Sequence, residues 1–131
     1  MAVTRYNAKD WVVTVAGVNI TGLGEDMITF EKEEAFFEPA VGAQGDIVKN
    51  EINNSIYNMG ITVQVTSPQL SHLLALKDRT QSFPIWAASK ALGIRLGGTM
   101  ANISEMPELS FGAEAEDVEI TFMVFDGVVQ A

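Results

Sequence analysis

The sequence lacks cysteine and has only one histidine, His72. Without a thiol the chain can form no disulfide bond, no thiolate zinc site and no cysteine nucleophile. One histidine cannot build a histidine metal cluster, and no serine or aspartate in a recognisable motif accompanies it to make a catalytic triad. We therefore expect no enzymatic activity, no metal and no cofactor, and we interpret His72 as a partly exposed residue of a helix.

Basic residues are scarce. The chain has 8 lysines and arginines against 17 acidic residues, which gives a formal net charge of −9. A negative average field repels phosphate groups, so tight binding to nucleic acid is not expected. Such a charge either keeps a concentrated protein in solution or has a specific role, and the composition is compatible with both.

Long apolar runs are absent too. No stretch approaches the roughly 18 residues that a membrane-spanning helix needs. The run Trp11–Ala16 is short and Asn19 soon follows it, which argues against a secretory signal. We expect no association with a membrane and no export through a signal peptide.

Apolar residues nevertheless make up 47% of the 131 positions, enough for one hydrophobic core. No composition shift, internal repeat or low-complexity tract divides the chain. The sequence therefore predicts a single domain over residues 1–131.

Alternation of apolar and polar residues is the main structural signal. It is clearest in Tyr57–Val65, where Met59, Ile61 and Val63 share one face, and it returns in Val118–Val124. Further strands are predicted near residues 11–15, 27–33, 82–88 and 93–106. We expect a mainly β protein, a sandwich or barrel of about six or seven strands.

One helix is predicted over about residues 68–79. Ser67 is a favourable N-cap, Pro68 suits the first helical position, and Leu70 and Leu73 lie on one helical stripe. After it, Pro84 cannot donate to a β-ladder, so we place residues 82–88 at a sheet edge.

Residues 34–54 have no strand or helix periodicity and form a predicted long loop. Apolar side chains are nevertheless frequent in it, and exposed apolar patches often mark contacts between proteins. The loop is either adhesive or a lid folded over its own core. On the first interpretation the candidate inter-subunit contacts are Phe36, Phe37, Pro39, Val41, Asp46, Ile47 and Val48.

Two acidic clusters and two glycine-rich segments carry no chemistry that we can identify. The clusters lie at residues 31–38 and 114–119 and lack the spacing of a calcium loop, so we interpret them as solvated faces. Gly22–Gly24 and Gly93–Thr99 lack the helix or the lysine of a phosphate-binding loop, and we interpret both as turns or bulges.

Four segments together resemble one known family. They are Val3–Asn7, Val41–Asp46 in the predicted loop, Asn53–Asn54, and Ile61–Pro68. Their order and spacing, the chain length and the acidic C-terminal strand are similar to the tail tube proteins of bacteriophages with contractile tails.

The resemblance implies a structural virion protein. Six copies would form a ring, rings would stack into a hollow tube through which DNA is delivered without specific binding, and a long loop would reach the next ring. Implied partners are further copies of the chain and the sheath and baseplate proteins, and the implied locations are the virion tail and, during assembly, the host cytoplasm. Candidate residues of the lumen or solvent wall are Thr62, Gln64 and Thr66.

A second interpretation comes from the predicted loop alone. A small β-sandwich that recognises a protein or a carbohydrate through residues 34–54 would show the same apolar residues in the same place. An enzyme that uses paired acidic residues is a third and weaker hypothesis. The size of the protein in solution separates the first two, since a binding module stays small and a tube subunit assembles.

Overall fold

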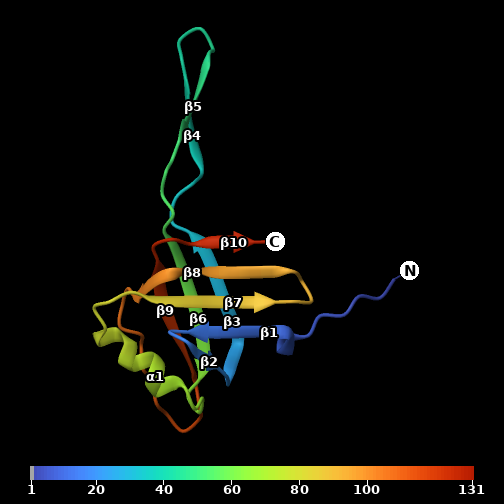
Figure 1. Ribbon diagram of the computed structural model, residues 1–131, viewed down its shortest axis with the longest axis vertical. Coiled ribbons are helices and arrows are strands. Elements are labelled where there is room, and N and C mark those ends of the chain that lie inside the picture. Colours follow the sequence, from blue (N-terminus) through green and yellow to red (C-terminus); the bar gives the residue numbers. More distant parts are fainter. Residues whose placement is uncertain (1) are drawn as a thin grey trace.

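The computed structural model describes residues 2–131, and its fold is mainly β (Figure 1). Ten strands and one short α-helix follow one another along the chain. In order, the elements are the 3-10 helix η1 (Ala8–Asp10), β1 (Trp11–Val15), β2 (Val18–Ile20), β3 (Leu23–Lys32), β4 (Phe37–Val41), β5 (Ile47–Glu51), β6 (Tyr57–Gln64), α1 (Leu70–Ala75), the 3-10 helix η2 (Leu76–Asp78), β7 (Phe83–Ser89), β8 (Ile94–Ile103), β9 (Asp117–Val124) and β10 (Val128–Gln130).

Eight strands form one antiparallel sheet that folds over on itself. The order is β2-β1-β7-β8-β9-β6-β3, with β10 beside the first half of β8. In Figure 1, β1, β7, β8 and β10 run across the view, while β3, β6 and β9 run steeply behind them. The two halves therefore cross as in an orthogonal sandwich, with β8 as the strand common to both.

The core lies between these two halves. Strands β6 and β9 pair over eight residues, and alternate side chains on both are completely buried. Phe83 of β7 meets Phe122 of β9 edge to face, with ring centroids 6.0 Å apart. Leu73 of α1 and Leu76 of η2 close one end of this core. The alternating patterns of β6 and β9 were therefore correctly predicted as strands with one buried face.

Strand β7 corrects one prediction. It lies between β1 and β8 and not at the sheet edge that we inferred from Pro84. The register of β7 against β8 shifts between Phe83 and Ile85, so the missing N–H of Pro84 falls at an irregularity of the ladder. On the other side the Pro84 carbonyl accepts a hydrogen bond from the Ala16 N–H at 2.8 Å. Gly97 of β8 lies opposite Trp86, and a Cβ there would meet the Ile85 carbonyl oxygen.

The helical segment is shorter than predicted, and it begins differently. Gln69 is the N-cap of α1 and its side chain makes no cap bond. The Ser67 hydroxyl instead donates to the Thr21 carbonyl at 2.6 Å, and the Gln69 side chain accepts from the Thr21 N–H at 2.9 Å. Both side chains tie the start of the helix to the turn after β2, and this tertiary link adds to a local bond from the Gln69 N–H to the Ser67 hydroxyl at 3.4 Å.

The predicted loop at 34–54 is wrong in one respect, because most of it is a β-hairpin. Strands β4 and β5 pair over five residues and project from the body of the protein (Figure 1). Every residue of both strands is exposed, so no burial selects alternating residue types, and the sequence shows no period. Because the hairpin points away from the sheet, the lid interpretation is wrong as well.

A carboxylate links the last two strands to the middle of β8. Asp126, in the turn between β9 and β10, accepts hydrogen bonds from the Thr99 N–H at 3.0 Å, the Met100 N–H at 2.9 Å and the Thr99 hydroxyl. Partial burial raises the pKa of Asp126, but these hydrogen bonds outweigh it and hold the pKa below the ordinary value of 3.8.

No helix within residues 2–131 is long and apolar enough to cross a membrane.

Replacing Asp126 with asparagine tests this link. The pKa of Asp126 is lower in the folded state, so the carboxylate stabilises the fold above its unfolded pKa, and this contribution is lost as the pH falls through the folded pKa. We expect Asp126→Asn to lower the free energy of unfolding at pH 7 by about 1–2 kcal/mol, and the difference from the wild type to shrink as the pH falls below 3.8. Denaturant melts at several pH values measure both.

Asp26→Asn is the matched control, because Asp26 is exposed and its side chain makes no hydrogen bond within residues 2–131. An Asp126→Asn protein as stable as this control at pH 7 would contradict the proposed role of the carboxylate.

Candidate functional site

The β4–β5 hairpin continues the ladder between β3 and β6. At its base the Glu33 N–H donates to the Ile56 carbonyl at 3.0 Å, and the Ile52 N–H donates to the Phe36 carbonyl at 2.9 Å. The turn after β9 supports the same place, because the Gly127 N–H donates to the Ser55 carbonyl at 3.0 Å. The root of the hairpin is therefore held by bonds next to the ends of β3 and β6 and by the turn after β9, and its direction follows from the sheet.

The two faces of this hairpin differ in chemistry. Directly opposed residues of an antiparallel pair point to the same face. The register pairs Phe37 with Glu51, Pro39 with Lys49 and Val41 with Ile47, so one face carries four apolar side chains. We call this set, Phe37, Pro39, Val41 and Ile47, the apolar face of the hairpin. The opposite face holds Glu38, Ala40, Val48 and Asn50.

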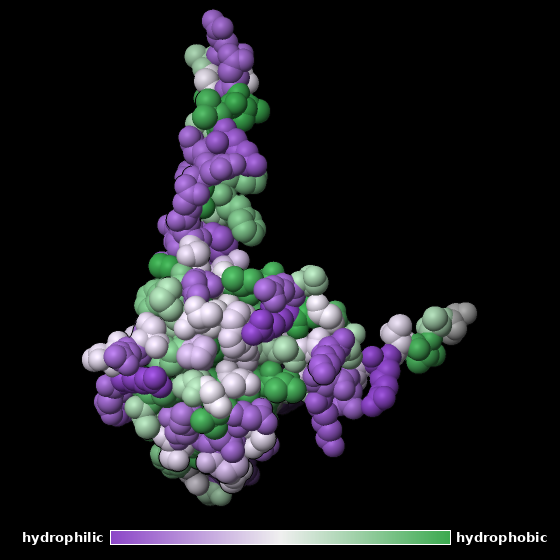
Figure 2. Space-filling view, in the orientation of Figure 1, coloured by the Kyte–Doolittle hydropathy of each residue, from purple (hydrophilic) through white to green (hydrophobic). Residues whose placement is uncertain are grey.

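The structure separates the seven candidate contact residues accordingly. Four of them form the apolar face, Val48 lies on the opposite face, Asp46 lies at the end of the turn and Phe36 precedes β4. All seven are exposed; Ile47 is 70% accessible and Val41 69%. Figure 2 shows the corresponding band of hydrophobic surface near the end of the hairpin, between polar segments.

Two lysines cover aromatic rings along the hairpin. Lys49 Nζ lies 4.7 Å from the ring centroid of Phe37, and Lys32 Nζ lies 5.1 Å from that of Phe36. A cation over an exposed ring contributes about 0.5–1 kcal/mol, so these contacts hold the rings in place without burying them. The aromatic side chains remain available to a partner.

The three candidate wall residues lie at one end of β6. Register pairs Thr62 with Glu119 and Gln64 with Asp117, which places all four on one face of the β6–β9 ladder. Thr62 is only 8% exposed, whereas Gln64 and Thr66 are exposed. The same face of β3, β6 and β9 also carries Thr29, Glu31, Asn58, Thr121 and Met123, and none of the paired residues of that face is basic.

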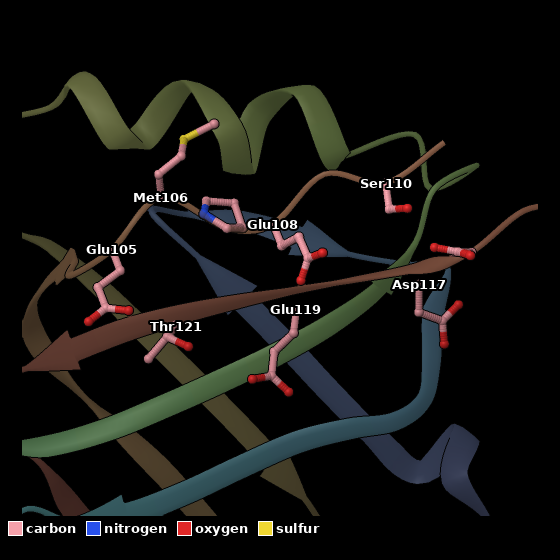
Figure 3. Close-up of a pocket in the computed structure, with 9 residues that line it drawn as sticks. Glu105, Met106, Glu108, Ser110, Asp117, Glu119 and Thr121 are labelled. Carbon is pink, nitrogen blue, oxygen red and sulfur yellow. The ribbon is translucent and has the colours of Figure 1, made fainter. Parts of the chain in front are cut away.

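A groove beside this face is a feature that sequence reasoning missed. It has a volume of about 500 Å³ and lies between β9 and the segment that leads into it (Figure 3). Its lining includes Glu105, Met106, Pro107, Glu108, Ser110, Glu116, Asp117, Glu119 and Thr121. We interpreted residues 114–119 as a solvated face because the sequence gives no sign that Glu105 and Glu108 lie opposite them.

The remaining candidates carry no catalytic geometry. His72 Nε2 lies 3.2 Å from the Val15 carbonyl oxygen, so the imidazole links α1 to β1. Within residues 2–131 no three or more metal-ligating side chains are grouped so that they could hold an ion. Both glycine-rich segments contain turns, as predicted: Gly22 has a positive φ of 68° in the β2–β3 turn, and Gly93 has a positive φ of 68° in the β7–β8 turn.

Solved structures of similar fold come from contractile injection systems. Residues covering 97% of this chain match 92% of a chain in the sheath–tube complex of the extracellular contractile injection system PVC, with a TM-score of 0.67 and 15% identity. The PVC sheath/tube terminator matches over 100% of both chains at a TM-score of 0.60 and 14% identity. The tube-terminating cap of the anti-feeding prophage matches over 100% of this chain and 95% of its own, with a TM-score of 0.64 and 14% identity.

These likenesses establish the fold, and at that level they confirm the resemblance that we drew from the sequence. They extend over the whole chain and not only over its sheet. No protein-family model matches the sequence, and no curated protein does.

The exposure of the hairpin generates a prediction about the isolated subunit. Surface substitutions away from buried features change the free energy of unfolding by no more than about 0.5 kcal/mol. We therefore expect Ile47→Asp and Val48→Asp, two neighbouring residues on opposite faces, to melt within a degree or two of the wild type, as thermal denaturation measures. A large loss of stability in either would mean that the hairpin packs on its own body.

Proposed function

We propose that this protein is a structural subunit of a contractile tail, six copies of which form a ring, and that stacked rings make the hollow tube through which DNA is delivered. The observation that carries the proposal is the β4–β5 hairpin. It projects from a domain of the fold found in tube and terminator complexes, and it exposes an apolar face. A two-stranded hairpin by itself is marginally stable in water, so a neighbouring subunit that covers this hairpin would stabilise it.

Unpaired strand edges supply the contacts between subunits within a ring. The outer edges of β2, β3 and β10 pair with no strand within residues 2–131. An unpaired edge is a template for another chain, and a head-to-tail contact that closes on itself gives a ring. The ten-residue strand β3 is the longest of these edges. Edge pairing would build the ring, and the hairpin would join one ring to the next.

The polar face of β3, β6 and β9 is suited to a lumen. It carries carboxylates, hydroxyls and amides, with Glu119 and Asp117 beside Thr62 and Gln64. A wall without basic side chains offers phosphate groups no favourable contact, so DNA would move along it without binding. In this assembly the sheath surrounds the tube and the baseplate ends it, the tube belongs to the virion after assembly in the host cytoplasm, and the subunit has no enzymatic role.

A terminating ring is the second candidate function, because a sheath/tube terminator and a tube-terminating cap share the fold over almost their whole length. A terminator would form the same ring and would stop growth. A tube subunit polymerises without limit, and a terminator gives single rings, so negative-stain microscopy of the concentrated protein distinguishes the two.

Substitutions on the hairpin test the stacking contact. We expect Ile47→Asp to abolish the stacking of rings, because a charge would be buried against an apolar partner, while the subunit stays folded. Val48→Asp lies on the opposite face and should leave stacking intact. Electron microscopy and sedimentation of both variants measure the effect. Stacking by Ile47→Asp equal to that of the wild type would contradict the assigned contact.

Added lysines test the lumen. In particles that contain the tube, Gln64→Lys and Thr66→Lys should slow the ejection of DNA, and more so at low salt, because exposed charges are screened over about 10 Å at 0.1 M ionic strength. Gln81→Lys, an exposed position before β7, is the control. Equal rates for all three variants at every salt concentration would remove this face from the lumen.

A further inference from the structure

One half of strand β9 has an open edge. The Thr121 carbonyl points away from β6 and accepts a hydrogen bond from the Ser104 N–H at 3.3 Å. The backbone N–H and C=O groups of a strand point to alternate sides at successive residues. Those of Glu119 and Asp117 therefore point away from β6, as those of Thr121 do. There β8 pairs only with Phe122–Val124, and no backbone partner within residues 2–131 meets Glu119 or Asp117.

The open edge lies along the acidic groove. Five carboxylates line the groove and no basic residue does; they belong to Glu105, Glu108, Glu116, Asp117 and Glu119. Figure 3 shows Glu105 and Glu108 directed from their segment toward β9, while Glu119 extends from β9 on the side of β6. Unpaired backbone groups receive an extended chain as an added strand, and the carboxylates favour one with a basic side chain.

The N-terminal segment of the chain has these properties. Residues 2–6 are exposed and belong to no helix or strand, and they extend away from the body of the protein (Figure 1). The Trp11 Nε1–H donates to the Tyr6 hydroxyl at 3.2 Å and fixes the root of this segment. Beyond that point it carries Arg5, which forms no ion pair within residues 2–131, and Val3, which is 94% exposed. We call residues 2–6 the N-terminal arm.

We propose that the N-terminal arm of one copy lies in the acidic groove of a second copy as an additional strand beside Asp117–Thr121. The proposal rests on the self-assembly proposed above and adds a specific contact to it. The arm has five residues, and the edge beside it spans Asp117–Thr121, where the Thr121 carbonyl already has a partner in Ser104. In an extended arm Arg5 and Val3 share one face, so the guanidinium meets the carboxylates while Val3 packs near the exposed Met106.

A synthetic peptide of residues 2–9 tests the contact without any need for rings. Added to the full-length protein, it should slow hydrogen exchange at the Glu119 amide by about tenfold or more at saturation, because that amide gains a bond. Exchange at the Met123 amide, which lies in the part of β9 paired with β8, should not change. An Arg5→Glu peptide should bind at least about tenfold more weakly, since it brings a like charge to the carboxylates.

Proline substitutions separate strand addition from simple attraction of charges. Neighbouring residues of a strand point their N–H groups in opposite directions, so only one of the Val3→Pro and Thr4→Pro peptides removes a hydrogen bond to β9. We expect one of the two to lose binding and the other to keep most of it. Equal binding by both would overturn the added strand.

The outcomes distinguish this inference from the proposed function. Binding of the peptide at the groove by a protein that forms no rings would retain the contact and refute the tube. Tubes that form normally from a protein with Arg5→Glu, together with no peptide binding at millimolar concentration, would retain the tube and overturn the arm contact. Peptide protection that maps to the hairpin and not to the groove would overturn it as well.

Discussion

The pairing of β6 with β9 is the constraint on which the rest of the structure depends. Over eight residues every second side chain of the two strands is buried except that of Tyr57, which is partly buried, and β3 and β8 then pair with their outer sides. Burying this apolar surface supplies most of the stability of a domain this size, at about 25 cal/mol for each Å². The segments between the paired strands are thereby left to the surface, where the projecting hairpin, the helix and the acidic groove are found.

The position of the hairpin follows from that pairing. β3 and β6 are antiparallel neighbours, and the chain that connects them continues as β4 and β5. A ladder that runs beyond the edge of the core loses its burial but keeps its hydrogen bonds. Such an extension is stiff enough to reach a neighbour and depends little on its own side chains for folding. Its apolar face is therefore available for contact between subunits.

The charged side chains of the protein are mostly at its surface and rarely pair with one another. The only ion pair within residues 2–131 joins Lys77 to Asp78, so the excess of carboxylates is not neutralised inside the subunit. Lys32, Lys49 and Arg95 instead lie over aromatic rings, at 5.1, 4.7 and 3.7 Å from the centroids of Phe36, Phe37 and Trp86. Carboxylates on the face of β6 and β9 remain free of basic partners. The face of β6 and β9 and the groove beside it are therefore both acidic.

The sequence by itself determined the features that depend on local periodicity. Alternation over residues 57–65 and 118–124 predicted β6 and β9 with the correct buried faces, and the glycine segments were recognised as turns and bulges, because these patterns report burial and backbone geometry directly. It also identified the apolar residues of segment 34–54, though not their conformation. An exposed hairpin has no buried face, so apolar and polar residues do not alternate along its strands.

Only the tertiary structure decided what depends on residues distant in the chain. It placed Pro84 inside the sheet at an irregularity, linked Ser67 and Gln69 at the start of the helix to Thr21, and split the contact candidates into two faces. It brought Glu105 and Glu108 opposite Glu119, and it left one half of β9 without a partner strand. Strand register and edge pairing are set by the packing of the whole sheet, and no short stretch of sequence encodes them.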